Sequence, residues 1–184
     1  MRLLGHALLA TLSAAFVLTA TAGAAQSPQA LVSALVKAKV TSADLPHGYS
    51  APVVSVYKIS ADVKKHGAIG GAQIFADGGN EAVIYIVFKT PALAGADWKH
   101  ANFHGAQTSA APSSIPKPNV QINTTAGATV NGKKITFGLT EIAMLSRNVI
   151  VQSITTSTKS TKHGDVTGAV LLAQFAQKHL SAAR

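Results

Sequence analysis

The chain contains no cysteine. It therefore forms no disulfide, holds no thiolate-bound metal, uses no cysteine nucleophile and carries no lipid on an N-terminal cysteine. Aromatic residues make up 5% of the chain and charged residues 12%, against 47% for apolar residues. This balance is typical neither of a disordered chain nor of a highly charged tail that binds nucleic acid. The length of 184 residues predicts a single domain.

Acidic residues are also scarce, and the chain lacks the common catalytic motifs. Its 7 Asp+Glu are scattered singly, which does not favour catalysis by paired carboxylates. There is no nucleophile elbow, HExxH zinc motif or dinucleotide fingerprint, and the glycine-rich stretch 67–71 lacks the Lys-Ser/Thr of a phosphate loop. We interpret that stretch as a flexible turn. A Ser-His-Asp triad stays open, because its members can lie far apart in sequence. The sequence thus favours a non-enzymatic protein and predicts no cofactor.

The first 25 residues have the three parts of a secretory signal peptide. Met1-Arg2 is a positive start, residues 3–20 are uncharged and mostly apolar, and Ala22-Gly23-Ala24 has the small-residue pattern of a cleavage site. The alternative is a permanent membrane anchor, but several polar or small residues interrupt the run. The sequence therefore predicts a cleavable signal over 1–25, a periplasmic or secreted protein, and a region 26–184 without a transmembrane segment.

What the chain does have is positive charge. It has 16 Lys+Arg and a net charge of +9. After loss of Arg2, 15 basic and 7 acidic residues remain, a net charge of +8. The lysines are dispersed, Arg147 and Arg184 are the only arginines left, and export separates the protein from the genome, so we exclude nucleic acid as a partner. An anionic envelope surface or a small ligand is the expected partner, and the oligomeric state stays open.

Four histidines directly follow a lysine: His66, His100, His163 and His179. Histidine gains a proton between neutral and mildly acidic pH, so acid would strengthen attraction to lipid head groups or other polyanions. The alternative is a well-solvated basic surface that keeps an alanine-rich domain in solution, and we favour it.

The pattern of the chain predicts an α+β fold. Asp77-Gly78-Gly79-Asn80 and Asn131-Gly132 are typical hairpin turns, and a third hairpin is expected around Ser146–Asn148. Ser27-Pro28, Thr90-Pro91 and Asp165 are typical helix starts. Hairpins joined by short turns form antiparallel sheets. We therefore expect an antiparallel sheet of about six strands, packed with N-terminal, central and C-terminal helices, and a loop over residues 105–118.

One group of side chains has the spacing of a helical metal site. In the helix expected over residues 91–104, Asp97, His100 and His104 fall at i, i+3 and i+7, within about 60° of one another. Carboxylate and imidazole are ligands for zinc, copper and nickel. The alternative is a stripe of solvated histidines at the edge of the core, beside a buried Trp98. We favour this alternative and keep Asp97, His100 and His104 as candidate metal ligands.

Taken together, the sequence predicts an exported protein that acts as a non-catalytic binding or accessory module with a basic surface. The alternative is a periplasmic metal-binding protein that uses the Asp97, His100 and His104 stripe. No motif in the chain identifies the ligand.

Overall fold

A computed structural model of the chain describes residues 26–77, 81–101, 106–130 and 132–184. The predicted signal over 1–25 and the candidate ligand His104 lie outside these residues. The elements, in chain order, are α1 (Pro28–Lys37), β1 (Val53–Val56), α2 (Ala61–Lys65), β2 (Ala68–Ala76), β3 (Glu81–Phe88), α3 (Pro91–His100), β4 (Gln107–Ser109), β5 (Asn119–Val130), β6 (Lys133–Ser146), β7 (Val149–Ser157) and α4 (Val166–Ala182). None of the described helices has the length and hydrophobicity to span a membrane.

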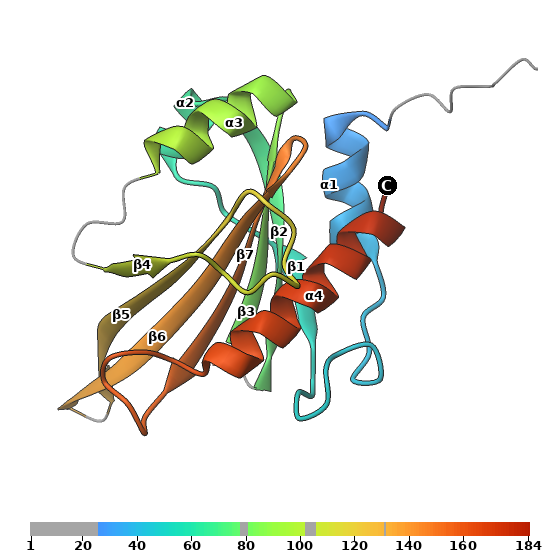
Figure 1. Cartoon of the computed structure of the whole chain (residues 1–184). Helices are drawn as coiled ribbons and strands as arrows, with labels where there is room; N and C mark the ends of the chain where they lie inside the picture. Colours follow the sequence, from blue (N-terminus) through green and yellow to red (C-terminus); the bar gives the residue numbers. More distant parts are fainter. Residues whose placement is uncertain (1–25, 78–80, 102–105, 131) are drawn as a thin grey trace, which may run out of the picture.

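The strands form a single antiparallel sheet in the order β1-β2-β3-β7-β6-β5-β4. Helices α1 and α4 lie against one face, and α2 and α3 lie against the other (Figure 1). The predicted α+β class is confirmed. The seventh strand is β4, a short edge strand inside the segment that the sequence predicted as a loop.

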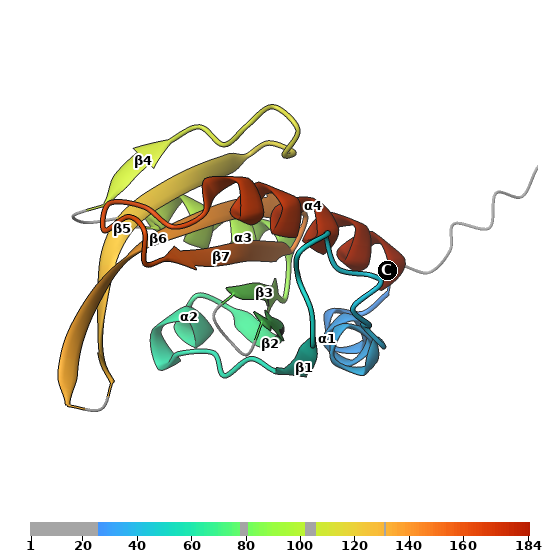
Figure 2. The same cartoon turned by 90° about the horizontal axis from the view of Figure 1, so that it is seen from below.

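The sheet is strongly bent. Figure 2 shows the hairpin of β5 and β6 curling toward the side of the sheet that carries α2. We call that side the concave face. It carries Ala82, Ile84, Ile86 and Phe88 of β3 and the β7 residues that pair with them, such as Ile150. The opposite face packs against α1 and α4.

Local sequence signals set the helix starts. The side chains of Ser27, Thr90 and Asp165 accept hydrogen bonds from the backbone N–H groups three residues ahead, at 3.2, 3.2 and 3.0 Å. Proline follows the first two caps, as predicted. These caps satisfy N–H groups that a helix leaves free at its start.

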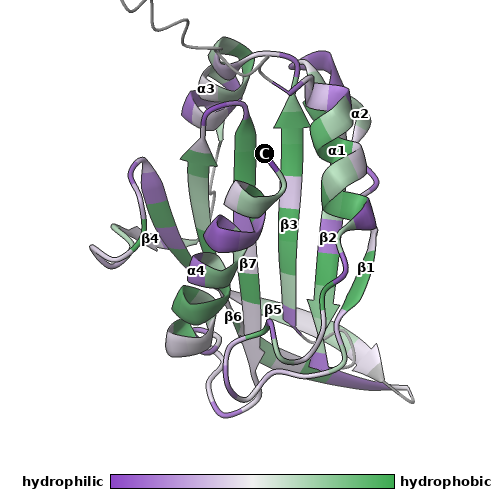
Figure 3. Cartoon of the chain, turned by 90° about the vertical axis from the view of Figure 1, so that its right-hand side faces the viewer, coloured by the Kyte–Doolittle hydropathy of each residue, from purple (hydrophilic) through white to green (hydrophobic). Residues whose placement is uncertain are grey.

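Strand β3 is an interior strand of the sheet, between β2 and β7. Most of its residues are buried on both faces of the sheet, and Figure 3 shows that the strand is hydrophobic along most of its length. The interpretation of residues 67–71 as a flexible turn is wrong, because Ala68–Gly71 belong to β2. Glycine is needed there for close packing: a Cβ on Gly71 would clash with the carbonyl oxygen of Tyr85 on the paired strand.

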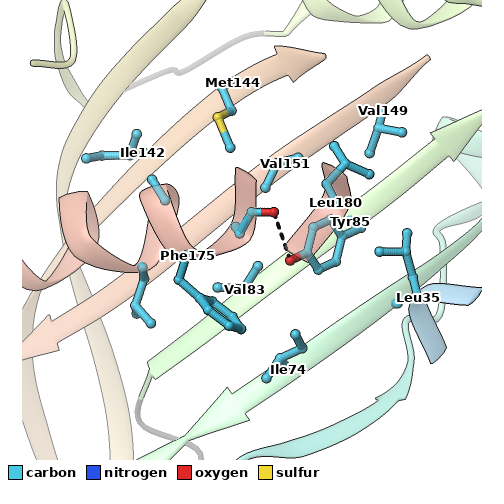
Figure 4. Close-up of a cluster of buried hydrophobic side chains, with 14 of the residues drawn as sticks. Leu35, Ile74, Val83, Tyr85, Ile142, Met144, Val149, Val151, Phe175 and Leu180 are labelled. Carbon is cyan, nitrogen blue, oxygen red and sulfur yellow. Dashed lines mark hydrogen bonds between the residues drawn. The ribbon is translucent and has the colours of Figure 1, made fainter. Parts of the chain in front are cut away.

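The main core lies between the sheet and helices α1 and α4 (Figure 4). Leu35 of α1 and Leu172, Ala176 and Leu180 of α4 are buried in this core. Tyr85 is fully buried in this core, and its hydroxyl donates a hydrogen bond to the carbonyl oxygen of Ala176, 3.3 Å away. A buried hydroxyl needs such a partner, so the bond fixes how α4 sits on the sheet.

Candidate functional site

Helix α3 places two of the three predicted metal ligands next to the concave face. Asp97 is partly buried, with 16% of its side chain exposed, and His100 is exposed. The structure does not assemble a metal centre from them: among the described residues, no three His, Asp or Glu side chains form a group able to hold a metal ion.

Asp97 instead contacts a histidine from another part of the chain. His66, the residue that ends α2, places Nδ1 2.6 Å from Oδ1 of Asp97. An ionised carboxylate only accepts hydrogen bonds, so the Nδ1–H of His66 is the donor. The two residues are 31 positions apart. No helical or strand period relates them, so the sequence offered no signal for this pair beyond the histidine itself.

A second polar pair lies on the sheet beneath these helices. Glu141 of β6 and Gln152 of β7 point to the concave face, and the Nε2–H of Gln152 donates to Oε1 of Glu141 at 2.8 Å. Burial raises the pKa of Glu141 above its usual range, and the hydrogen bond from Gln152 opposes that shift in part. Glu141 was not among the candidate residues predicted from the sequence. Its one signal is that it interrupts a row of apolar residues on β6.

These pairs line one cavity of about 390 Å³, which we call the Trp98 cavity. Such a volume is within the range of small-molecule sites. Polar groups, an indole and apolar side chains share its wall: Asp62, Val63, His66, Ile86, Asp97, Trp98, His100, Ala101, Glu141, Ala143, Ile150 and Gln152.

The lining of the Trp98 cavity is richer in acidic residues than the chain as a whole. Three of the seven acidic residues of the chain line it: Asp62, Asp97 and Glu141. Among the described residues of its wall there is no lysine or arginine, although the chain has 16 of them. Every lysine is instead exposed on the surface. The electrostatics of this cavity therefore favour a positive charge.

Trp98 has two roles in this arrangement. It packs against a small core under α2 and α3 that includes Phe88 and Ile150, in agreement with the core position expected for it. It also forms part of the cavity wall. An aromatic face beside carboxylates is a favourable surface for an organic cation, because the negative face of the ring attracts positive charge.

A cavity of about 530 Å³ also lies between the ends of α1 and α4. Its lining combines Lys39, Lys178 and Asp44 with apolar side chains. His179 contributes a ring whose Nδ1 lies 3.0 Å from the hydroxyl oxygen of Tyr85, and burial lowers the pKa of this histidine. Charges of both signs meet here, so this lining does not select one class of ligand.

Comparison with known proteins does not assign this chain to a family. No family model matches the chain, and no curated protein matches it. Among solved structures, the chain is similar to the extracellular domain of PknH from Mycobacterium tuberculosis, with 13% sequence identity and a TM-score of 0.39. The match covers 78% of this chain and 94% of that domain.

Proposed function

We propose that the protein is an exported, non-catalytic binding module, and that the Trp98 cavity holds a positively charged group of its ligand. One observation carries the proposal: a largely buried carboxyl, Glu141, lies beside an indole in a cavity free of lysine and arginine among its described residues, within a chain of net charge +9. Export is supported by the signal pattern of residues 1–25.

The polar groups of the cavity fit binding better than catalysis. Glu141 is paired with Gln152, and Asp97 is paired with His66. The described wall includes no serine, threonine, tyrosine or lysine that would act as a nucleophile beside that His-Asp pair. A cation in the cavity would lie near Asp62, Asp97, Glu141 and Trp98, groups that can stabilise a bound positive charge without a reaction.

The single tryptophan of the chain provides the assay, because all tryptophan fluorescence comes from the cavity wall. We would titrate the protein with choline and with 3,3-dimethyl-1-butanol, a neutral molecule of nearly the same shape. Choline should change the emission of Trp98, and the neutral isostere should bind at least about tenfold more weakly. Equal responses to the two molecules would refute the proposed charge selection.

Variants locate the binding. Glu141→Gln keeps the size of the side chain and removes its charge, so choline should bind roughly tenfold more weakly. The matched control is Asp44→Asn, which removes an exposed carboxylate outside the Trp98 cavity and should leave choline binding unchanged. Unchanged choline affinity in Glu141→Gln would contradict the assignment of this carboxyl.

Metal binding is the second proposal. The observation in its favour is that Asp97, its partner His66 and His100 all line the same cavity, so an imidazole and a carboxylate are already in contact there. To bind a metal ion, Asp97 would have to give up its hydrogen bond to His66. His100 and His104 would then be the other two ligands proposed from the sequence.

A further inference from the structure

The apolar row on β6 continues past the Trp98 cavity. Alternate residues of a strand point to the same face, so the row that contains Glu141 also contains Ile135, Phe137, Leu139, Ala143 and Leu145. Helices α2 and α3 pack over the Leu145 end of this row. At the other end Ile135 is 46% exposed, and Phe137 and Leu139 are half-buried.

Neighbouring strands extend this apolar surface across the sheet. Ile154 of β7 lies directly opposite Glu141, Ala82 of β3 lies opposite Ile154, and Phe75 of β2 lies opposite Ala82. Ile154 and Phe75 are half-buried, like Leu139. With strands about 4.8 Å apart, the surface from β6 to β2 is roughly 14 Å wide. We call Phe75, Ile135, Phe137, Leu139 and Ile154 the open strip.

Glu141 joins the open strip to the Trp98 cavity. Its carboxyl lines the cavity, while Leu139 precedes it by two residues in the same row and Ile154 is its cross-strand partner. A molecule with its positive group in the cavity thus has an apolar surface within reach of about 7 Å along β6. Apolar groups that remain in contact with water on the folded protein gain stability when a ligand covers them.

We propose that the ligand is a monomeric amphiphilic cation, such as a long-chain alkylammonium, with its head group in the Trp98 cavity and its alkyl chain on the open strip. This inference rests on the proposed function of the cavity. The net charge of +9 and the exposed lysines attract anionic amphiphiles without specificity, so a preference for the cation is the signature of this site.

The test is a series of alkyltrimethylammonium ions with methyl, hexyl and decyl chains, each kept below its micelle-forming concentration. Trp98 fluorescence and calorimetry give the dissociation constants. Each methylene group that leaves water favours binding, so the decyl ion should bind at least about tenfold more tightly than tetramethylammonium. Decyl sulfate serves as the anionic comparison, and vesicles of phosphatidylcholine with stearylamine serve as the membrane comparison.

Variants in the open strip distinguish binding of the alkyl chain from binding of the ammonium head group. Ile135→Ser and Leu139→Ser should each weaken binding of the decyl ion several-fold and leave tetramethylammonium unaffected. Ile135 is exposed enough that its replacement should not harm folding. The matched control is Leu171→Ser on α4, where a leucine is 38% exposed away from the open strip and should not affect either ion.

The outcomes distinguish the proposed cation site in the Trp98 cavity from the inference that the ligand is an amphiphile. If tetramethylammonium binds at the cavity and the decyl ion binds no more tightly, the amphiphile inference is wrong and the proposed cation site stands. If no member of the series binds, both are wrong. Tighter binding of decyl sulfate than of the decyl cation, or binding to the stearylamine vesicles without binding of the monomeric ion, would also overturn the inference.

Discussion

Glu81, the first residue of β3, allows a sharp test of the electrostatics of this fold. Its Oε1 accepts a hydrogen bond from the backbone N–H of Thr156 at 3.4 Å, while Oε2 is buried and has no hydrogen-bond partner among the described residues. Burial, followed by the charges of Asp165 and Asp77, raises the pKa of Glu81 to about 7. The folded protein therefore favours the protonated form of this side chain.

The direction of the pH effect follows from that shift. In the unfolded chain Glu81 has the ordinary glutamate pKa of about 4.5, so between about pH 4.5 and 7 the unfolded state loses its proton first. Stability contributed by the protonated carboxyl is complete below this interval and is lost as the pH rises through about 7. The full shift would correspond to about 3 kcal/mol. Because the side chain is only half-buried, solvent screening reduces our expectation to about 1–2 kcal/mol.

Glu81→Gln is the corresponding perturbation, because the amide stays neutral at every pH and keeps an oxygen for Thr156. At pH 8 the variant should be more stable than the wild type by about 1–2 kcal/mol, and near pH 4 the two should be equal. Urea unfolding followed by circular dichroism from pH 4 to 8.5 measures the difference. Asp44→Asn is the control of opposite sign, since hydrogen bonds from Thr41 lower the pKa of Asp44. A stability difference for Glu81→Gln that does not change with pH would refute the reasoning.

Three further predictions concern the core, the metal proposal and the basic surface. Leu35→Ala, at a fully buried position, should reduce the free energy of unfolding by about 3 kcal/mol, whereas Val53→Ala at a 59% exposed position should cost well under about 1 kcal/mol; urea unfolding compares them. If the metal proposal is right, the wild type should take up zinc, copper or nickel more tightly in native mass spectrometry than a variant with His100→Ala and His104→Ala, and equal weak uptake by both would contradict it. The protein should sediment with anionic liposomes at low salt near pH 5.5 and release as salt rises, because screening weakens attraction between surface charges; no binding at low salt would count against an anionic envelope partner.

The sequence determined those features that depend on neighbouring residues. Caps at Ser27, Thr90 and Asp165 act within three residues, so three of the helix starts were predictable. The apolar run of residues 82–88 likewise indicates a strand buried on both faces, and β3 is buried along most of its length. Hairpins need only short turns, and the antiparallel α+β sheet followed from them.

Features that depend on distant residues were decided by the tertiary structure. Strand β2 includes the glycine-rich stretch, and Gly71 is needed there because the paired strand β3 leaves no room for a Cβ. Local propensity does not contain this constraint. Asp97 is hydrogen-bonded to His66, although the helical spacing predicted that it would be grouped with His100 and His104.

The candidate site shows the same division. Composition established a basic chain without cysteine, which excluded thiol chemistry but could not say where the few acids lie. Folding brings Asp62, Asp97 and Glu141 from two helices and a strand around one cavity and leaves every lysine on the surface. The net charge of a protein is a sum over its sequence. The electrostatic potential in a cavity depends instead on how far each charged group lies from it. Only the tertiary structure therefore decided that acidic residues line a cavity of this basic protein.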